Sequence, residues 1–378
     1  MKFTVSATNF ATAIESAAKF VSAKPLMPIL SSVKIEAQRS IKEGSELLIT
    51  GFDLVHGIET LTTGVEVYES GSICANAAHL LALVKQLSGQ LIIEVIDELI
   101  TITTLSGTVN LQGLSVEDYP DLFDDIAESN SYQIEAKTLL TAWKYCKVSA
   151  STDETKMILQ GVNIAAVDGI LKIASTDGHR LTACTMSIDD AVSIPSITIP
   201  AKSIDLLPNI NNSSDDTDAS WVTNISVHDS TCVISNNTSK IITRLYEGKY
   251  PDYNMLLPKA FKRELTIDKS RLVEALNLMS SIGNQKNIAT LEITINKVIV
   301  TSSRDGADGK MSIDCSLAGD DLTLSFSIKY LLAQLKIVST KLVKFSLNGA
   351  LEPVTIEPVG LDNGIDLTCL VMPIQLRD

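Results

Sequence analysis

One pattern of strand and helix recurs three times along this sequence, and the repetition limits the possible folds more than any other feature. Alternating polar and apolar residues, followed by an apolar stripe at helical spacing, begin at Phe3, Tyr132 and Leu265. These starting points lie roughly 130 residues apart, close to one third of the 378-residue chain. The sequence therefore predicts three similar domains in tandem.

The second half of each repeat also follows a common order. A strand ends in a turn at Asp53, Asp177 and Arg304, and a further strand then runs directly into a second helix. Each repeat closes with sequence rich in β-branched residues, which is typical of strands. We therefore expect an α+β fold of three repeats, each with two helices and about eight short strands.

Acidic, turn-forming segments separate the repeats. The tripeptide Tyr-Pro-Asp occurs at residues 119–121 and again at 250–252, near the end of a repeat in both cases. The polar run Asn211–Ser220 is rich in turn-forming residues and is expected to form a loop within the second repeat. The predicted domains are residues 1–127, 128–258 and 259–378.

The composition is that of an acidic globular protein. With 45% hydrophobic residues the chain can bury a core, which excludes disorder, and its composition also excludes collagen and coiled coil. Its 31 basic and 45 acidic side chains give a net charge of −14, which argues against binding nucleic acid over the whole surface. A basic strip within an acidic surface is still compatible with this charge.

Two further features concern the cellular compartment. No apolar run is long enough to span a membrane, and the N-terminal residues lack the apolar segment of a signal peptide. The six cysteines are scattered without CxxC spacing, which predicts reduced, mostly buried thiols rather than disulfides or a zinc site. We expect a cytoplasmic protein that holds no metal.

Lysines recur on one side of the predicted helices. Lys85, Lys144 and Lys336 each follow the first core leucine of their helix by five residues, which turns them about 140° away from the core. Lys19 lies about 180° from Phe10 on the opening helix. Each lysine alone is typical of a solvated helix face. If the repeats surround a common axis, however, the shared position predicts a basic surface that holds phosphates by charge alone.

The turn in the second repeat contains Asp177, His179 and Arg180, which suggests a hydrolase or nuclease with His179 as base and Asp177 orienting it. The sequence contains no GxSxG, HExxH or P-loop motif, and no carboxylates clustered at motif spacing, that would support this chemistry. An isolated Asp-Gly-His-Arg after a strand is more typical of a structural turn. The hydrolase is therefore the second alternative.

Several short motifs resemble those of one protein family. They are the opening MKFTV, Lys24-Pro25 with Pro28-Ile29-Leu30, STDGHRL at 175–181, YPDY at 250–253, Pro353-Val354 with Ile356-Glu357, and VMPI at 371–374. With these motifs and its three repeats, the whole chain resembles the bacterial sliding clamps, the beta subunits of DNA polymerase III. STDGHRL and the VMP tail are the most specific parts of the resemblance.

The resemblance implies a head-to-tail homodimeric ring with helices lining the hole and sheets outside. Such a ring encircles double-stranded DNA without sequence preference, acts as a processivity factor for the DNA polymerase III core, and catalyses no reaction. The clamp loader, other polymerases and repair proteins are further implied partners, and no cofactor is implied.

The resemblance also implies three sets of site residues. Short partner peptides with Gln, Leu and Phe are expected in a hydrophobic cleft between the second and third domains, formed by Leu159, Thr176, His179, Arg180, Leu181, Pro251, Leu256, Leu351, Pro353, Leu370, Val371, Met372, Pro373 and Ile374. The expected DNA-binding residues are Lys19, Lys24, Lys85, Lys144, Lys147, Lys202, Lys329 and Lys336. The expected dimer interface pairs Val109 and Leu111 with Ser281, Ile282 and Lys286.

Overall fold

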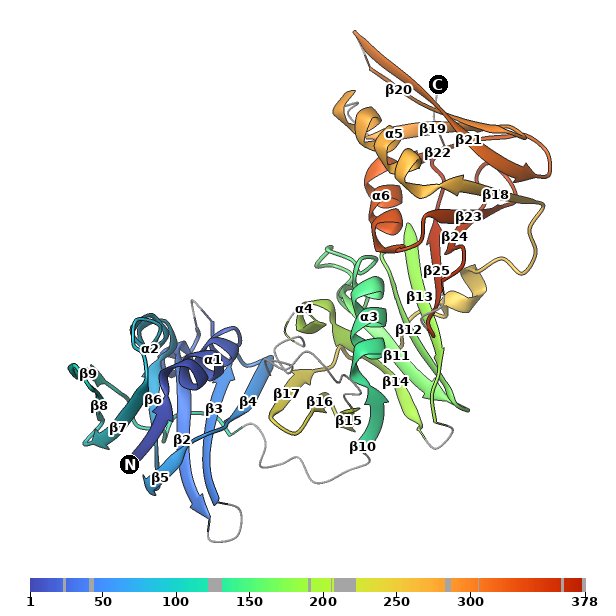
Figure 1. Cartoon of the computed structure of the whole chain (residues 1–378). Coiled ribbons are helices and arrows are strands. Elements are labelled where there is room, and N and C mark those ends of the chain that lie inside the picture. Colours follow the sequence, from blue (N-terminus) through green and yellow to red (C-terminus); the bar gives the residue numbers. More distant parts are fainter. Residues whose placement is uncertain are drawn as a thin grey trace. The chain divides into compact units, whose positions relative to one another are not determined.

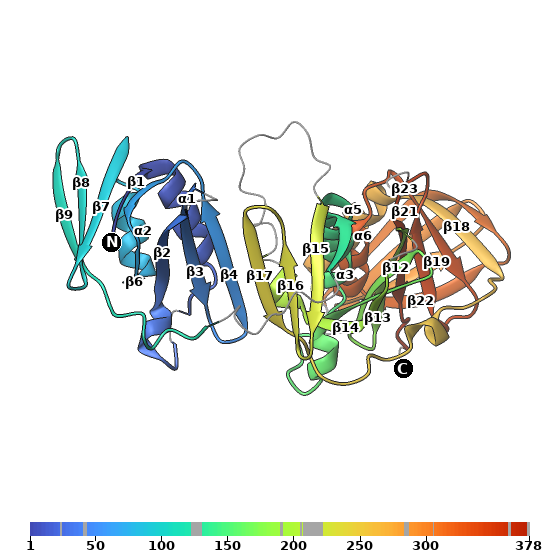
Figure 2. The same cartoon turned by 90° about the horizontal axis from the view of Figure 1, so that it is seen from below.

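Figure 1 shows the computed structural model of the chain, and Figure 2 shows it turned by 90°. The structure describes residues 1–22, 25–40, 44–121, 131–189, 192–204, 206, 222–282, 287–304, 306–361 and 364–375. By their internal contacts they form two compact units. Unit 1 comprises residues 1–137 and 202–245, and unit 2 comprises residues 138–201 and 246–378.

Unit 1 holds two antiparallel sheets with two helices. Its elements are β1 (Lys2–Ser6), α1 (Ala7–Ala18), η1 (Pro28–Ser31), β2 (Ser32–Ser40), β3 (Gly44–Phe52), β4 (His56–Thr62), β5 (Glu66–Glu69), β6 (Gly71–Asn76), α2 (Ala77–Val84), β7 (Gln90–Ile96), β8 (Leu99–Thr104), β9 (Gly107–Gln112), β10 (Ser131–Glu135), β15 (Val222–His228), β16 (Thr231–Ser235) and β17 (Ser239–Arg244). The sheet orders are β5-β1-β7-β8-β9 and β10-β15-β16-β17-β4-β3-β2-β6. The short helix α4 (Ala201–Ile204) lies at the border with unit 2.

Unit 2 is built on one twelve-stranded antiparallel arrangement. Its elements are α3 (Ala136–Lys147, from Thr138 on), η2 (Met157–Gln160), β11 (Gly161–Val167), β12 (Ile170–Thr176), β13 (Arg180–Ser187), β14 (Ile194–Pro200), η4 (Tyr253–Leu256), β18 (Arg263–Asp268), α5 (Lys269–Ile282), β19 (Ile288–Ile293), β20 (Lys297–Arg304), β21 (Ala307–Ala318), β22 (Leu322–Ser327), α6 (Ile328–Ile337), β23 (Leu342–Leu347), β24 (Val354–Pro358) and β25 (Asp366–Val371). The strand order is β14-β11-β12-β13-β25-β24-β23-β18-β21-β20-β19-β22.

Helices α1 and α2 each begin with a polar residue at the end of the preceding strand, whose side chain caps the helix. Ser6 Oγ accepts a hydrogen bond from the backbone N–H of Asn9 at the start of α1, and Asn76 Oδ1 accepts one from His79 at the start of α2. The apolar stripe at helical spacing that the sequence places at Phe10, Ile14, Ala17 and Val21 is confirmed for Phe10, Ile14 and Ala17, which are buried on α1, whereas Val21 lies beyond the end of the helix at Ala18. The helical pattern therefore runs slightly past the true helix, because the chain turns before Val21 is reached.

The helices pack in pairs on one face of the sheets. In unit 1, α1 contacts α2 and crosses β3 and β4, while in unit 2 α5 contacts α6, β20 and β21. Gly51 in β3 permits the close crossing, because a β-carbon there would collide with the backbone of Ala17 in α1. The large buried side chains Phe3 and Phe10 lie in the layer of unit 1, with their ring centroids 6.1 Å apart.

Two strand pairings join segments that are far apart in the sequence. In unit 1, β4 pairs with β17, and in unit 2, β13 pairs with β25. The two pairings share a detail just beyond their ends. The N–H of Arg244 donates to the carbonyl of Val55 at 3.0 Å, and the N–H of Met372 donates to the carbonyl of His179 at 2.9 Å. The same junction geometry thus occurs once in each unit.

The structure also bears on the cysteine and membrane expectations. All six cysteines are free thiols, and five of them are buried, with Cys315 half-buried, so the prediction of mostly buried thiols is confirmed. Burial raises the pKa of the Cys74 and Cys232 thiols to about 12, which keeps them protonated and unreactive at neutral pH. No helix in the described ranges is long and apolar enough to cross a bilayer. The predicted loop Asn211–Ser220 lies outside the described residues.

Candidate functional site

The candidate site forms where β13 meets β25 in unit 2. The antiparallel register places Arg180 opposite Val371 and Leu181 opposite Leu370. On the other side of β13, Leu181 lies opposite Thr176 of β12. The sheet itself therefore joins three predicted cleft residues to Leu181 or to its neighbour Arg180, although nearly 200 residues separate β13 from β25.

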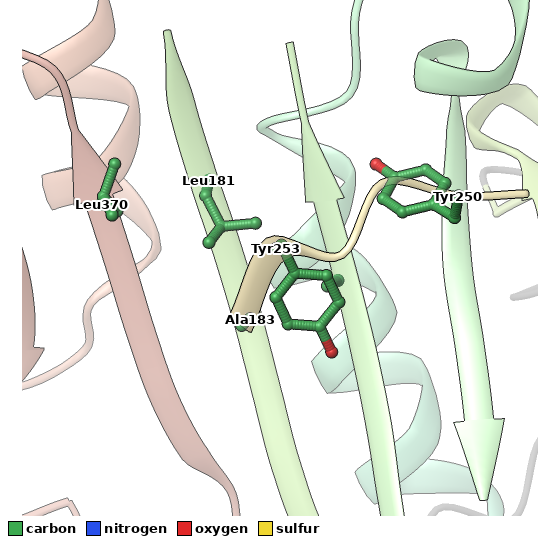
Figure 3. Close-up of a cluster of buried hydrophobic side chains, with 6 residues drawn as sticks. Leu181, Ala183, Tyr250, Tyr253 and Leu370 are labelled. Carbon is green, nitrogen blue, oxygen red and sulfur yellow. The ribbon is translucent and has the colours of Figure 1, made fainter. Parts of the chain in front are cut away.

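An apolar cluster covers this part of the sheet. Its buried members are Ala174, Leu181, Ala183, Tyr250, Tyr253 and Leu370, and Ile158, Leu159, Leu257 and Met372 pack against it. Figure 3 shows Leu181 and Leu370 on neighbouring strands, with the segment from Tyr250 to Tyr253 crossing the sheet beside them. Burial raises the pKa of Tyr253 to about 12, so its hydroxyl stays neutral. Of the predicted cleft residues, the cluster thus brings together Leu159, Leu181, Leu370 and Met372.

A tight turn supports the end of β13. Asp177 Oδ1 accepts hydrogen bonds from the N–H groups of His179 at 2.9 Å and Arg180 at 3.1 Å, and its Oδ2 accepts one from Arg180 Nε at 2.9 Å. Gly178 takes a positive φ of 93°, which a glycine adopts at little cost. Thr176 adds a hydrogen bond from its hydroxyl to the Arg180 carbonyl at 2.7 Å. The carboxylate therefore anchors Arg180 in a structural turn, which is the alternative to a catalytic Asp–His pair.

Tyr330 of α6 closes one side of the turn. Its ring stacks on that of His179 with centroids 5.9 Å apart and an interplanar angle of 14°. The Arg180 guanidinium carbon lies 4.9 Å from the centroid of the same ring, a cation–π distance. Tyr330 was not among the residues expected from the sequence, since it lies about 150 residues from His179 and no local pattern marks it.

The remaining cleft residues frame the apolar cluster. Leu256 and Leu351 are about half exposed, at 47% and 52%, Pro251 is also exposed, and Pro353, Pro373 and Ile374 are half-buried. The segment after β25 is held as far as Ile374, because the N–H of Ile374 donates to the Ser325 carbonyl of β22 at 2.7 Å. The candidate cleft therefore has buried apolar walls and partly exposed leucines at its rim, a surface suited to apolar side chains of a peptide.

A separate hollow of about 340 Å³ lies on the same sheet face. Its lining mixes apolar residues with polar ones such as Lys172, Thr185 and Asp366, and it shares Ala183, Tyr253 and Leu257 with the apolar cluster and the residues packed against it. The lining of this hollow therefore differs from that of the cleft. Figure 3 shows Ala183 and Tyr253, which also belong to the apolar cluster, close together. Among the described residues, no three His, Cys, Asp or Glu side chains are grouped so that they could hold a metal ion.

The predicted basic residues lie on helices or at their ends. Lys19 and Lys85 are the C-terminal caps of α1 and α2, Lys144 lies on α3, and Lys336 on α6, and all four are exposed as expected. Lys85 forms an ion pair of 3.0 Å with Glu15, which reduces the net positive charge around it. Of the four added through the resemblance, Lys202 and Lys329 are exposed and Lys147 is half-buried, whereas Lys24 lies outside the described residues.

The predicted interface residues occupy an edge strand and the end of a helix. β9, which carries Val109 and Leu111, is the last strand of its sheet, and Val109 is 37% exposed. Ser281 is exposed and Ile282 half-buried at the C-terminal end of α5. Lys286 lies outside the described residues.

Comparison with known proteins defines the class of protein to which this fold belongs. Three family models match the chain in order: the N-terminal domain of the DNA polymerase III beta subunit at residues 1–123, its central domain at 133–252 and its C-terminal domain at 254–375. The fold is thus the three-domain fold of the clamps, a mixed α and β architecture with few helices.

Individual relatives agree with these matches over the full length. The beta sliding clamp of Synechocystis sp. is 30% identical over 400 residues, with 100% of both chains covered, and that of Synechococcus elongatus is 28% identical with the same coverage. The DNA polymerase sliding clamp of Bacillus subtilis superposes with a TM-score of 0.90 at 26% identity, covering 100% of both chains. The beta subunit of Streptococcus pyogenes DNA polymerase gives a TM-score of 0.91 at 24% identity, again over 100% of both chains.

The chain belongs to the family of DNA polymerase III beta subunits, the bacterial beta sliding clamps. Its function is that of a processivity factor in DNA replication, a non-catalytic role within this family. The resemblance found in the sequence is thereby confirmed, and the hydrolase alternative has no support among the relatives.

Proposed function

We propose that two copies of the chain close head to tail into a ring that encircles double-stranded DNA and tethers the DNA polymerase III core through the cleft. Each copy contributes three domains, residues 1–127, 128–258 and 259–378. The protein performs no bond chemistry, slides without sequence preference, and works in the cytoplasm. The clamp loader, other polymerases and repair proteins use the same cleft.

One observation carries the ring proposal: the strand junction between successive repeats is used twice within the chain. In unit 1 the junction pairs β4 with β17, with His56 opposite Thr243. In unit 2 it pairs β13 with β25, with Arg180 opposite Val371. A third use of the junction would join β21 of one copy to β9 of the next, and two such joints close a dimer head to tail.

Both strands needed for the third junction have a side without a partner strand. β20 pairs along β21 from Ala307 to Asp314, while β18 pairs only with its far end, from Cys315 to Ala318. In the described part of the chain no strand covers the second side of β21 before Cys315, and none lies beyond β9. Free strand edges expose unpaired N–H and carbonyl groups, so pairing them with each other satisfies both.

The register of this joint follows from equivalent positions on β21. His56 follows Asp53 by three residues, and Arg180 follows Asp177 by three residues. Ala307 stands in the same relation to Arg304, the end of the corresponding strand in the third repeat. Ala307 is therefore the counterpart of the first residue in both existing junctions.

The counterpart on β9 is Leu111. It lies opposite Ile100, the second residue of β8, just as Thr243 lies opposite Cys232, the second residue of β16. We therefore expect Ala307 to pair with Leu111 of the partner subunit, and Gly309 with the partner's Val109. A β-carbon at Gly309 would collide with the Ile282 side chain, so the end of α5 lies against this edge, which supports Ser281 and Ile282 as part of the proposed interface. Lys286 completes the proposed interface set.

The apolar cluster supports the cleft as the site for partner peptides. A peptide with a Gln followed by Leu and Phe would insert its two apolar side chains beside Leu181, Leu256 and Met372. Burial of two such side chains contributes about 3–6 kcal/mol before the cost of ordering the peptide. The net affinity should be micromolar, about −8 kcal/mol at most, which permits partners to exchange.

The exposed lysines support sequence-independent contact with DNA. Lys144, Lys329 and Lys336 lie on α3 and α6 of unit 2, and Lys19, Lys85 and Lys202 lie on helices or their caps in unit 1. Lys24 and Lys147 complete the proposed set. Contacts to phosphates alone provide affinity without reading bases, which suits a ring that slides.

Retention on circular DNA tests the proposal. Protein loaded by its clamp loader should remain on a nicked circular duplex through a high-salt gel-filtration column and be lost when the circle is cut once. Sizing with light scattering should give the dimer mass, 2 × 40.7 = 81.4 kDa. Equal retention on linear and circular DNA would contradict topological encirclement.

A further inference from the structure

A closed triangle of hydrogen bonds lies in the interior of unit 2. Gln334 Nε2 donates to Ser149 Oγ at 2.6 Å, and the Thr182 hydroxyl donates to Gln334 Oε1 at 3.0 Å. Ser149 Oγ and Thr182 Oγ1 are 2.7 Å apart and form the third side. All three residues are fully buried, at 0% exposure. The triangle joins the turn after α3, strand β13 and helix α6.

With the Gln334 amide oriented so that Nε2 faces Ser149 and Oε1 faces Thr182, counting protons fixes the direction of the remaining hydrogen bond. A threonine hydroxyl has one proton, and that of Thr182 is already used toward Gln334. The Ser149 hydroxyl must therefore donate to Thr182, so each of the three side chains donates once and accepts once around the ring. A buried polar network with its groups satisfied in this manner tolerates little displacement, since any shift leaves a donor or acceptor without a partner in a dry interior.

The triangle lies next to the contact that Tyr330 makes with His179 and Arg180. Gln334 follows Tyr330 by four residues on α6, so the two side chains leave the same face of the helix one turn apart. On the facing strand, Thr182 follows His179 and Arg180, the two residues that contact the Tyr330 ring. Helix α6 is thus tied to β13 twice, by an aromatic and cationic contact at the surface and by hydrogen bonds in the interior.

We propose that Gln334 is a positioning residue for the peptide cleft, holding α6 at the one position relative to β13 in which Tyr330 stacks on His179 and Arg180. The inference rests on the proposed role of the cleft. The contact of Tyr330 with His179 and Arg180 does not fix the helix alone, because ring contacts are favourable over a range of about 4.5–7 Å between centroids, whereas a hydrogen bond requires a narrow range of distance and angle. Gln334 itself touches no peptide.

The test measures peptide affinity in the full-length protein at a temperature well below its unfolding midpoint. The probe is a fluorescein-labelled peptide with a Gln followed by Leu and Phe, read by anisotropy. Gln334→Leu should weaken binding about tenfold, whereas the same substitution in a Tyr330→Ala background should change it by less than about twofold, because the residue acts through Tyr330. Equal losses in both backgrounds, or no loss in either, would overturn the inference.

Two controls separate positioning from general stability. Thr243→Val removes a buried hydroxyl pair of the same kind in unit 1, where Ser203 Oγ and Thr243 Oγ1 are 2.9 Å apart, and should lower the unfolding midpoint without changing peptide affinity.

The triple variant Gln334→Leu, Thr182→Val and Ser149→Ala removes every member of the triangle, so it should recover stability while peptide binding stays weak. Recovery of both properties in the triple variant would show that the triangle acts only on stability.

The outcome for the wild type separates this inference from the proposed function. If the wild-type protein does not bind the peptide at all, the cleft assignment fails. If it binds the peptide and Gln334→Leu binds it equally well, the cleft stands and only the positioning role of Gln334 is rejected.

Discussion

At the scale of single residues, one turn is built twice with different partners. Asp53 accepts hydrogen bonds from the N–H groups of Val55 and His56, as Asp177 does from the residues two and three positions after it. The third position then differs. His56 pairs its ring nitrogen with Asp53 at 3.1 Å, whereas Arg180 pairs its guanidinium with Asp177. The repeated use of this carboxylate argues for a structural role in both turns.

The pKa of Asp53 makes a prediction about acid stability. Burial raises this pKa, but hydrogen bonds from the His56 side chain and from the backbone of His56 and Val55 outweigh it, so the pKa lies below its ordinary value. A lowered pKa stabilises the fold above the unfolded value of about 4, and this contribution is lost as the pH falls through the folded value. Asp53→Asn should therefore lower the free energy of unfolding by about 1–2 kcal/mol at pH 7.

Urea unfolding at several pH values checks this expectation. The gap between wild type and Asp53→Asn should be constant from pH 7 to pH 5 and should close below about pH 4. A gap that is as wide at pH 3 as at pH 7 would mean that the charge on Asp53 is not what stabilises the turn.

Met372 gives a second residue-scale prediction, concerning the cleft. Its side chain packs against the apolar cluster, and its backbone N–H is held by His179. Met372→Ala should weaken binding of the fluorescein-labelled peptide about tenfold, or about 1.4 kcal/mol, because it removes apolar surface from the cleft without changing the backbone. The matched control is Arg244→Ala, which alters the equivalent position of the unit 1 junction. If both variants bind the peptide alike, the cleft has been assigned to the wrong junction.

At the scale of elements, the side chains at the two strand junctions explain why only the junction in unit 2 is proposed as a cleft. The unit 1 junction has its own apolar cluster, formed by Ile29, Leu30, Phe52, Cys74 and Tyr119. Phe52 precedes Asp53 as Thr176 precedes Asp177, so a large buried ring stands where the unit 2 junction has a small hydroxyl. Gly57 likewise takes the place of Leu181. In unit 1 the chain's own side chains therefore occupy the place that the proposed cleft takes in unit 2.

The edge strand β9 allows the ring interface to be tested by backbone chemistry. The N–H of Gly113 donates to the Glu98 carbonyl, and the antiparallel alternation then directs the N–H groups of Val109 and Leu111 toward β8 and that of Asn110 outward. Asn110→Pro should therefore remove an interface donor while sparing the pairing with β8, since proline is tolerated on the outer side of an edge strand.

The expected result is a loss of the dimer without a loss of the fold. Light scattering should give 40.7 kDa for Asn110→Pro at micromolar concentration, with unchanged circular dichroism. Asn110→Ala retains the N–H and should keep the dimer mass. A proline variant that remains dimeric would rule out β9 as the closing strand.

At the scale of the whole molecule, a small number of lysines has to hold DNA against a net charge of −14. Lys144→Glu with Lys336→Glu should weaken loading equally on any DNA sequence and should lower the slope of log affinity against log salt by about two units, about 0.9 for each phosphate that a lysine no longer neutralises. Both lysines are exposed on helices.

The matched control reverses the same amount of charge elsewhere. Lys172 lies on β12 within the sheet, and Lys259 lies in the loop before β18, and both are exposed. Reversal of this pair should leave the salt slope unchanged, because net charge alone does not define a phosphate contact. An equal effect of both pairs, or a dependence on DNA sequence, would place the DNA-contacting surface elsewhere.

The sequence by itself determined the repetition and the turns of this protein. Helical and strand periodicities and the Asp-containing turns depend on residues close together in the chain, so they can be recognised without a structure. The cleft residues were placed from motifs of the family. Their cluster within the sheet, with Leu181 beside Leu370, became evident only from the pairing of β13 with β25.

Tertiary structure alone decided what stands behind and beside that cleft. Tyr330 and Gln334 carry no local signal, since an aromatic and an amide on an amphipathic helix are ordinary in sequence. Their roles arise because packing brings α6 against β13 and the turn after α3, from segments about 150 and 185 residues away. A buried amide becomes specific only when its partners are fixed around it, and those partners are chosen by the fold rather than by neighbouring residues.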